Sequence, residues 1–433
     1  METLVQEQVL VDAPRCPHLE PRFSLLKQSL VAKHDKEKVI ASYQRLCGIL
    51  SQEAALIDKF GPAIVPEIDF SVIHQNNGIL PDGLVDLVRD RGCVVIRNVV
   101  PEAQAFAWET ELKEYTRKYS GVGGFPEDNP QNWSLWWTRP QVQIRSHPQV
   151  VEVMRAISKL WKTSDPTLPI DLNTQVVYPD RFRIRYPSED QEYTLNAHLD
   201  SGSIERWEDP EYRKIYARIF AGEWETYDAW LADHRTDADM NIYNASTNCS
   251  CWRSMQGWLS LSHSNTGEGT LRLLPSLKAS TAYCMLRPFF FFPTREFHPH
   301  LDMGRSMIGI PPVRPGDYVF WHCDLIHEVD KFHPGKTDSS VVYYPCTPLT
   351  PYNLDSLMGV REAFLAASPP RDFRGLVKES ESEHAENGAR KENILSEDGM
   401  RGMGFLKFDE DAGDLTPGQR VIRRQANEAL GLS

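Results

Sequence analysis

Two histidines and one aspartate have the residue types and the spacing of a metal site. His198 and Asp200 are separated by a single residue, and His327 follows in the last third of the chain. Two imidazoles and one carboxylate can bind divalent iron on one face and leave the opposite positions free for a substrate and oxygen. We therefore predict that His198, Asp200 and His327 are metal ligands and that they form a catalytic iron centre.

The His-x-Asp pattern occurs three times, so its position in the fold must distinguish the candidates. The other two copies are His300-Leu301-Asp302 and His322-Cys323-Asp324. In a jelly roll the pattern follows an early core strand, and the third ligand lies on a late strand with several strands between them. Only the copy at His198 leaves enough chain for those strands. His322 is the alternative third ligand; we favour His327 and interpret His322 as a packed residue that orients a ligand.

Composition indicates a folded protein of enzyme size. The chain has 433 residues, of which 41% are hydrophobic and 10% aromatic, including 11 Trp, enough for a sizeable core. No segment approaches the roughly 18 uncharged apolar residues that span a bilayer. The first residues also lack the basic and then apolar pattern of a signal peptide. These features predict a cytoplasmic protein that does not bind membranes.

Charge and cysteine content exclude further classes of function. The formal charge of −13 opposes binding to a phosphate backbone, so no nucleic-acid partner is predicted. The 8 Cys are scattered, and Cys249 and Cys251 form a C-x-C pair without the second pair of a zinc ribbon. We expect reduced thiols, a small-molecule substrate and no protein partner.

Alternating apolar segments predict an α+β fold with a double-stranded β-helix, the jelly roll of the cupins. The apolar run at 92–100 is typical of a strand buried on both faces. At 175–186 the alternation places Arg181, Arg183 and Arg185 on one face of a strand. The predicted organisation is an N-terminal arm and helices (1–60), a core (61–350) with a helical insertion (208–250), and a C-terminal helical extension (351–433). A charged segment at 378–397 is predicted to be a mobile part of the surface.

Longer motifs resemble a known family. They are the stretches 178–185, 198–203 with Glu205-Arg206-Trp207, 253–258, and Pro315-Gly316-Asp317 through Trp321-His322 to His327. Together they resemble the family catalogued as domain of unknown function 1479 (DUF1479). That family is similar in turn to phytanoyl-CoA-hydroxylase-like oxygenases. The resemblance implies Fe(II) bound by His198, Asp200 and His327, with 2-oxoglutarate and O2 as co-substrates. It also implies oxidation of a small amino acid such as valine in secondary metabolism, as in fungal members associated with aziridine formation.

One departure from the phytanoyl-type pattern concerns the carboxylate of 2-oxoglutarate that lies far from the metal. That pattern places an arginine on the strand after the distal histidine, where this chain has Asp338. A dicarboxylate still needs a cationic partner, preferably a bidentate guanidinium. Arg253 and Arg206 are the first candidates, and Arg287 and Arg185 follow. Ser340, at the start of the last core strand, is a further candidate contact.

The substrate pocket is expected to be lined by inward residues of the core strands. Trp258 on the central strand, and Val341 and Tyr343 on the last, are the candidates, and simple core packing is the alternative for each. Hydroxylation and oxidative ring closure are both possible outcomes. Two rival functions stay open: a metal-dependent hydrolase or isomerase on the same barrel, and a jelly-roll binding protein without catalysis.

Overall fold

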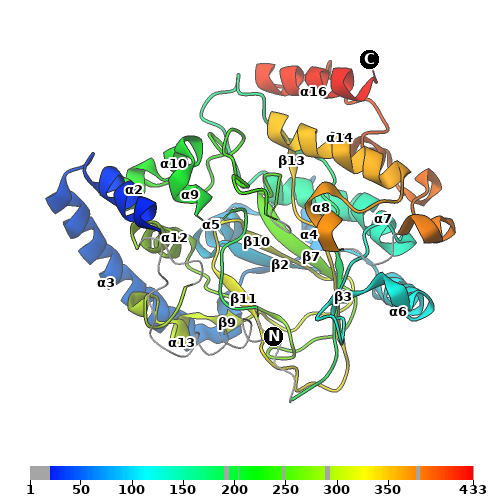
Figure 1. The fold of residues 1–433 in the computed structure, drawn as a ribbon, viewed down its shortest axis with the longest axis horizontal. Coiled ribbons are helices and arrows are strands. Elements are labelled where there is room, and N and C mark those ends of the chain that lie inside the picture. Colours follow the sequence, from blue (N-terminus) through cyan, green and yellow to red (C-terminus); the bar gives the residue numbers. More distant parts are fainter. Residues whose placement is uncertain are drawn as a thin grey trace.

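The computed structural model describes residues 20–189, 195–202, 204–245, 249–287, 293–376 and 381–432. Strands lie at the centre and helices surround them (Figure 1). Residues 1–19, the first part of the predicted N-terminal arm and helices, lie outside the described residues, as does the phenylalanine-rich stretch 289–292. Within the described part, no helix is long and apolar enough to cross a membrane.

The largest sheet has eight strands in the order β1-β2-β10-β7-β12-β6-β4-β3. Their bounds are β1 (Glu67–Asp69), β2 (Cys93–Arg97), β10 (Tyr318–His322), β7 (Met255–Ser260), β12 (Ser339–Tyr343), β6 (Phe182–Arg185), β4 (Asn132–Trp133) and β3 (Gly124–Phe125). Neighbouring strands are antiparallel except β1 and β2. The strand predicted to be buried on both faces is β2, and its first four residues are buried. Its β-branched side chains suit that central position.

Register decides which side chains of this sheet share a face. Arg183 pairs with Val341 across β6 and β12, and Tyr343 pairs with Trp258 across β12 and β7. Because directly paired residues project from the same side and neighbours along a strand alternate, these four side chains share one face. Ser340 projects from the other face.

A smaller sheet contains β11 (His327–Val329), β8 (Leu271–Leu273) and β9 (Ile308–Gly309), all antiparallel. A third pair joins β13 (Pro348–Leu349) to β5 (Asp171–Gln175). In the described residues these sheets are not joined by hydrogen bonds into one closed barrel. The α+β class is therefore confirmed, and the jelly-roll assignment stays a prediction.

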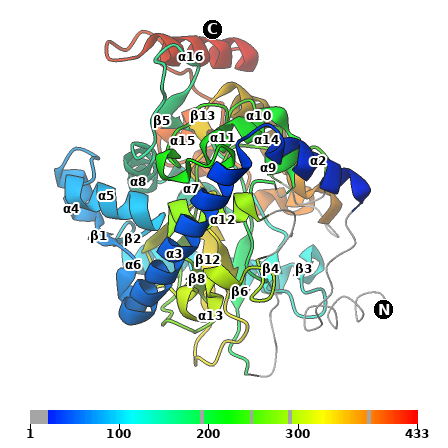
Figure 2. The same cartoon turned by 90° about the vertical axis from the view of Figure 1, so that its left-hand side faces the viewer.

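The helices predicted between 23 and 60 are α2 (Pro21–Val31) and α3 (Lys36–Phe60). Asp35 caps α3 by accepting from the backbone N–H groups of Glu37 and Lys38. Figure 2 shows α3 lying across one side of the molecule, where it contacts α12 (Leu277–Leu286) and α13 (Met303–Ser306). The remaining helices are α4 (Phe70–Gln75), α5 (Asp82–Arg91), α6 (Glu102–Lys118), α7 (Arg139–Ser146), α8 (Pro148–Ser158), α9 (Glu205–Glu208), α10 (Pro210–Ile215), α11 (Ala217–Phe220), α14 (Pro351–Leu365), α15 (Glu397–Gly402) and α16 (Pro417–Leu430).

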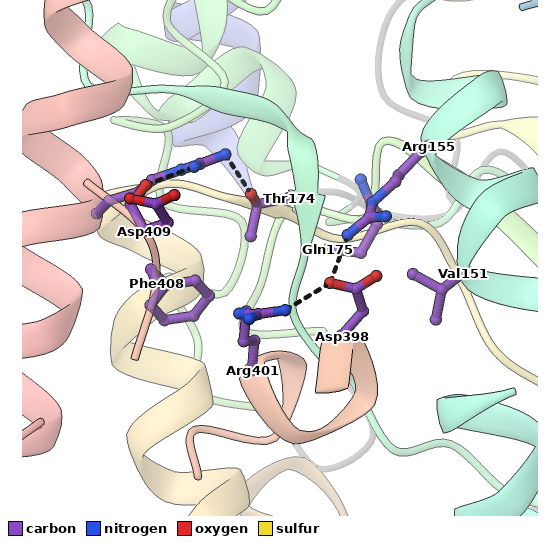
Figure 3. A pocket seen from close by; sticks show the side chains of 9 residues that line it. Val151, Arg155, Thr174, Gln175, Asp398, Arg401, Phe408 and Asp409 are labelled. Carbon is purple, nitrogen blue, oxygen red and sulfur yellow. Dashed lines mark hydrogen bonds and ion pairs between the residues drawn. The ribbon is translucent and has the colours of Figure 1, made fainter. Parts of the chain in front are cut away.

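Ion pairs hold the C-terminal extension to the core. Asp398 of α15 pairs with Arg155 of α8 at 2.8 Å and with Arg401 at 3.1 Å (Figure 3). Arg423 of α16 pairs with the buried carboxylate of Asp171 at 2.7 Å. Arg155, Asp398, Arg401 and Arg423 line a surface pocket, and because each of them takes part in an ion pair, we assign them a structural role.

The charged segment at 378–397 differs from the predicted mobile surface segment. Residues 377–380 lie outside the described part, but Glu381 and His384 are buried. The carboxylate of Glu381 accepts hydrogen bonds from the backbone N–H groups of Trp136 (2.8 Å) and Trp137 (2.9 Å). The prediction rested on the low aromatic content of the segment. It missed these buried residues because hydrogen bonds between a polar side chain and the backbone of another segment leave no periodic pattern in the sequence.

The Gly316-Asp317 motif forms the turn into β10. Gly316 has φ +92°, and an added Cβ would lie 2.0 Å from the carbonyl oxygen of Val100. Asp317 is buried and accepts from the backbone N–H of Asn98 at 2.9 Å, while Arg97 pairs with it at 2.6 Å. The motif therefore fixes the strand that leads to His327.

Candidate functional site

The structure brings together the three residues predicted to bind metal. One possible ligand atom from each of His198, Asp200 and His327 lies within 4.8 Å of the others. The Nε2 atom of His198 is 3.6 Å from Oδ1 of Asp200, and that of His327 is 3.8 Å from Oδ2. The juxtaposition expected from the sequence is therefore present.

Backbone pairing places the two histidines side by side. The N–H of His198 donates to the carbonyl of His327 at 2.9 Å, and the N–H of His327 donates back at 3.1 Å. This bridge extends the small sheet beyond β11. After Asp200 the chain turns sharply at Ser201 (φ +64°) and Gly202 (φ +79°). The turn leaves the carboxylate at the end of the paired segment, facing both rings.

Hydrogen bonds fix the tautomer and the orientation of both imidazoles. The Nδ1 atom of His198 is 2.6 Å from the carbonyl oxygen of Asn196, and that of His327 is 3.0 Å from the carbonyl oxygen of Leu325. A carbonyl can only accept, so each Nδ1 carries the proton. Each Nε2 then has a lone pair available for a metal, as in most histidine ligands.

Electrostatics favour the same protonation states. Burial, together with neighbouring His198, lowers the pKa of His327 to about 3, so this ring is neutral at physiological pH. Burial raises the pKa of Asp200, but Arg253 and the two histidines outweigh it and hold that pKa well below its usual range. The donor set is thus ionised carboxylate and imidazole nitrogen, which fits Fe(II).

A cavity of about 440 Å³ opens beside the three residues. Aromatic side chains form much of its wall, and they include Trp258 and Tyr343, as predicted from the sequence. Val341 projects from the same face of β12 but does not line the cavity. The space and its apolar wall suit a small molecule with an apolar part.

The predicted cofactor contacts do not all reach this cavity. Arg253 lines it, with Nη2 3.4 Å from Oδ2 of Asp200. Arg206 does not line the cavity. Its Nη2 atom instead donates to the backbone carbonyl of Asp200 at 2.5 Å. Ser340 points to the other face of the sheet, and its backbone N–H donates to the hydroxyl of Ser262 at 2.8 Å. The assignments of Arg206 and Ser340 as cofactor contacts are therefore corrected.

The two lower-ranked arginines are also occupied elsewhere. Arg185 donates to the carbonyl oxygen of Asp330 at 2.9 Å. Arg287 donates to the carbonyl oxygen of Phe297 at 3.1 Å. Asp338, at the position where phytanoyl-type oxygenases have an arginine, pairs with Lys113 at 2.7 Å. None of these residues lines the cavity.

Arg181 and Arg183 also line the cavity, and Arg183 differs from the other two arginines in its surroundings. Its side chain is 2% exposed, and in the described part of the chain it forms no ion pair. Nε has no hydrogen-bond partner there, and Nη2 makes one long contact, 3.4 Å from the carbonyl oxygen of Gly269. A buried guanidinium without a counterion is costly unless a ligand supplies one. The alternating Arg181, Arg183 and Arg185 were the signal in the sequence, but only the register shows that Arg183 shares a face with Tyr343 and Trp258 of the cavity wall.

The two other His-x-Asp copies have different surroundings. Asp324 is fully buried between Arg235 (2.7 Å) and Arg206 (3.2 Å). The ring of His322 stacks on that of Trp161 with 4.8 Å between the ring centroids, and its Nε2 lies 2.9 Å from the carbonyl oxygen of Ala229. His322 is thus packed away from Asp200, which favours His327 as the third ligand. At the remaining copy, the side chain of Asp302 is 42% exposed.

These observations define an α+β protein with a cavity lined by His198, Asp200 and His327, together with Arg183, which has no ion-pair partner in the described residues. A family model described as Gig2-like matches residues 17–294 and 291–405, so the chain belongs to the Gig2-like family. The Candida albicans protein GIG2 (GlcNAc Inducible Gene 2, DUF1479) is 38% identical, with a TM-score of 0.86 over 96% of each chain. The predicted membership of DUF1479 is confirmed.

Two bacterial proteins are also similar. A protein from Salmonella typhimurium LT2 that has been proposed to be an oxidoreductase is 28% identical, with a TM-score of 0.77 over 91% of this chain and 100% of that chain. YbiU of Escherichia coli K12, an uncharacterized protein, is 29% identical over 376 residues, or 79% of this chain and 88% of YbiU. The similarity therefore covers most of each protein.

Proposed function

We propose that this protein is a non-haem Fe(II)/2-oxoglutarate-dependent oxygenase that acts on a C–H bond of a small molecule. The observation that carries the proposal is one cavity that combines His198, Asp200 and His327 with the guanidinium of Arg183, which forms no ion pair within the described residues. When bound, iron and 2-oxoglutarate would supply, with O2, the oxidising power to remove hydrogen from carbon, and 2-oxoglutarate would become succinate and carbon dioxide. The Salmonella relative has been proposed to be an oxidoreductase, which supports an oxidising function for this protein.

The protein's own side chains would divide the work of binding 2-oxoglutarate. Arg183 would pair with the carboxylate far from the metal, because a charge-assisted contact there would satisfy its buried guanidinium. It lies on β6, directly beside the strand β12 that begins next to Asp338. Arg253 would remain on Asp200 and hold that carboxylate ionised and oriented toward the metal.

Substitution of Arg183 by methionine is expected to weaken 2-oxoglutarate binding by about 100-fold, since a hydrogen-bonded charge contact is worth about 1.5–3 kcal/mol. Fe(II) binding should be unchanged. The measurement is an anaerobic titration of the Fe(II) protein with 2-oxoglutarate, followed by the visible charge-transfer absorption of the chelate. Arg181→Met is the matched control, because Arg181 lines the same cavity but already pairs with Asp180 at 3.3 Å. Normal affinity in Arg183→Met with a large loss in Arg253→Met would assign the role to Arg253.

A small amino acid such as valine is the proposed substrate class. Asp180 lines the cavity, and its carboxylate, which also pairs with Arg181 at 3.3 Å, would bind the ammonium group. In the described residues, Nε2 of Gln256 and Nε1 of Trp321 are buried donors without partners, available to a substrate carboxylate. Trp258 and Tyr343 would contact the apolar side chain. Transfer of oxygen to the carbon that has lost hydrogen would give a hydroxylated product, whereas capture of that carbon by the substrate amine would give an aziridine, as proposed for secondary metabolism.

The decisive experiment is anaerobic reconstitution with Fe(II) and 2-oxoglutarate, followed by O2 and a succinate assay with a panel of amino acids. Succinate formation stimulated by one amino acid would support the oxygenase and identify its substrate class. Iron binding without a charge-transfer band or succinate, under conditions in which a known oxygenase responds, would contradict the proposal. It would favour the hydrolase, isomerase or binding-protein alternatives.

A further inference from the structure

Two cysteine thiols meet at the edge of the candidate metal cavity. The Sγ atoms of Cys249 and Cys251 are 3.6 Å apart, and Cys249 Sγ also lies 3.2 Å from the carbonyl oxygen of Cys251. Both side chains are buried, but Cys249 lines the cavity. We propose that Cys249 and Cys251 form a reversible oxidation site, which a peroxide converts to a disulfide and a dithiol restores. This thiol chemistry does not depend on whether the cavity binds 2-oxoglutarate.

The surroundings of Cys249 favour a reactive thiolate. Burial by itself raises the pKa of a thiol, as it does at Cys93 and Cys284, to about 12 in each. At Cys249 burial acts in the same direction, but the hydrogen bond with Cys251 and the positive charge of Arg253 outweigh it, and the pKa is lowered. The thiolate is the nucleophile in thiol oxidation, so Cys249 should react first.

The geometry supplies both access and a resolving partner. A peroxide is small and can enter through the same cavity that would admit a substrate, where it meets Cys249. Cys251 is buried and does not line the cavity, and burial together with the neighbouring Cys249 raises its pKa, so it stays a thiol until its partner is oxidised. No other two cysteines in the described residues are in contact.

The reaction balances with a hydroperoxide as the oxidant. The Cys249 thiolate attacks one peroxide oxygen, the O–O bond breaks, and Cys249 sulfenic acid forms with release of hydroxide. The Cys251 sulfur then attacks the sulfenic sulfur, the S–O bond breaks, and a second hydroxide leaves; the two thiol protons convert these hydroxides to water. With hydrogen peroxide, two thiols yield one disulfide and two waters, and the thiols lose two electrons that the peroxide gains.

Oxidation should be transmitted to the metal residues. A disulfide requires an S–S distance of about 2.05 Å, so the C-x-C turn must tighten. In the reduced protein the backbone N–H of Ser250 donates to Asp372 Oδ2 at 2.9 Å, and that of Trp252 donates to Asn353 Oδ1 at 2.7 Å. These hydrogen bonds hold the turn in its present conformation. Arg253 follows immediately and pairs with Asp200 at 3.4 Å. A tightened turn would therefore move the guanidinium that orients a proposed metal ligand.

The test is peroxide treatment of the full-length protein, followed by alkylation of free thiols and mass mapping of the cysteine peptides. The expected product has lost two hydrogens in the peptide that contains Cys249 and Cys251, and dithiothreitol reverses the change. In Cys251→Ser, Cys249 should stop at sulfenic acid and be trapped by dimedone. Cys284→Ser is the matched control and should form the disulfide normally. Alkylation of both thiols after peroxide treatment, or faster oxidation of Cys93 or Cys284, would overturn the proposal.

A second readout tests the link to the metal residues. Cobalt(II) titration of the oxidised wild-type protein should show affinity about tenfold weaker than that of the reduced protein, the scale expected when an outer contact of a metal ligand is lost. Peroxide-treated Cys251→Ala, which cannot form the disulfide, should keep the affinity of the untreated variant. Thermal unfolding of each variant verifies that it is folded. Equal affinity of the oxidised and reduced wild-type protein would refute transmission to the metal site.

Discussion

Asp200→Asn is expected to abolish Fe(II)-dependent succinate formation and to weaken Fe(II) binding by at least about 100-fold. The substitution keeps the size of the side chain but removes the negative charge that lies 3.6 Å and 3.8 Å from the two imidazole nitrogens. It also leaves the buried guanidinium of Arg253 without its carboxylate. His327→Ala should have the same effect on metal binding. Metal content after anaerobic loading and a succinate assay measure both quantities.

Another copy of the same sequence pattern supplies the control for this experiment. Asp302→Asn alters a partly exposed carboxylate. The backbone of Asp302 has φ +45°, which asparagine tolerates, so the variant should fold and leave iron binding unchanged. His322→Ala should destabilise the protein, because it removes a buried ring that stacks on Trp161. The ligand assignment would be wrong if folded His322→Ala lost iron and His327→Ala retained it.

Asp324→Ala is expected to lower the free energy of unfolding by about 3–5 kcal/mol, because it leaves two buried guanidinium groups without a counterion. Asp324 contacts Arg235 at 2.7 Å and Arg206 at 3.2 Å, and Tyr216 donates to it at 2.9 Å. Urea denaturation at neutral pH measures the change. The matched control is Asp338→Ala, since Asp338 pairs with the partly exposed Lys113; it should cost less than about 1 kcal/mol. A loss of that small size for Asp324→Ala would refute the assignment.

The pH dependence of this effect has a definite sign. Burial raises the pKa of Asp324, but Arg235 and Arg206 outweigh it and hold the pKa far below its usual range. A carboxyl with a depressed pKa in the folded state stabilises the protein above its unfolded-state pKa of about 3.9. That contribution is lost as the pH falls below this value toward the folded-state pKa. The difference between wild type and Asp324→Ala should therefore shrink progressively in acid.

Asp324 also links the stability of the fold to the loop at residues 200–202, which carries Asp200. Arg206, which it fixes, donates to the backbone carbonyl of Asp200 at 2.5 Å and also to that of Gly202. The loop that presents the carboxylate thus depends on a charge cluster that does not line the cavity. We expect Asp324→Ala to weaken Fe(II) binding even where the variant is folded.

The proximity of His198, Asp200 and His327 was predictable from the sequence because the residue types indicate a metal site and the strand topology brings the two segments together. Arg206 was misassigned as a cofactor contact because nearness to Asp200 in the chain does not fix the direction in which its side chain points. The positive φ angles of Ser201 and Gly202 return the chain beneath the loop. Arg183 presents the opposite case, since alternation gives its face but only pairing with Val341 shows what that face meets. Register across a sheet depends on distant strands, which local periodicity does not encode.

The paired backbone of His198 and His327 has a consequence for folding. The two residues belong to segments that are joined through the insertion at 208–250 and several strands, so a bound ion would act as a cross-link that closes a long loop. An ion that binds only the folded chain stabilises it by about 2.7 kcal/mol at 100 times its dissociation constant. Thermal melting with a series of divalent ions can therefore rank the metals that this site prefers before any substrate has been identified.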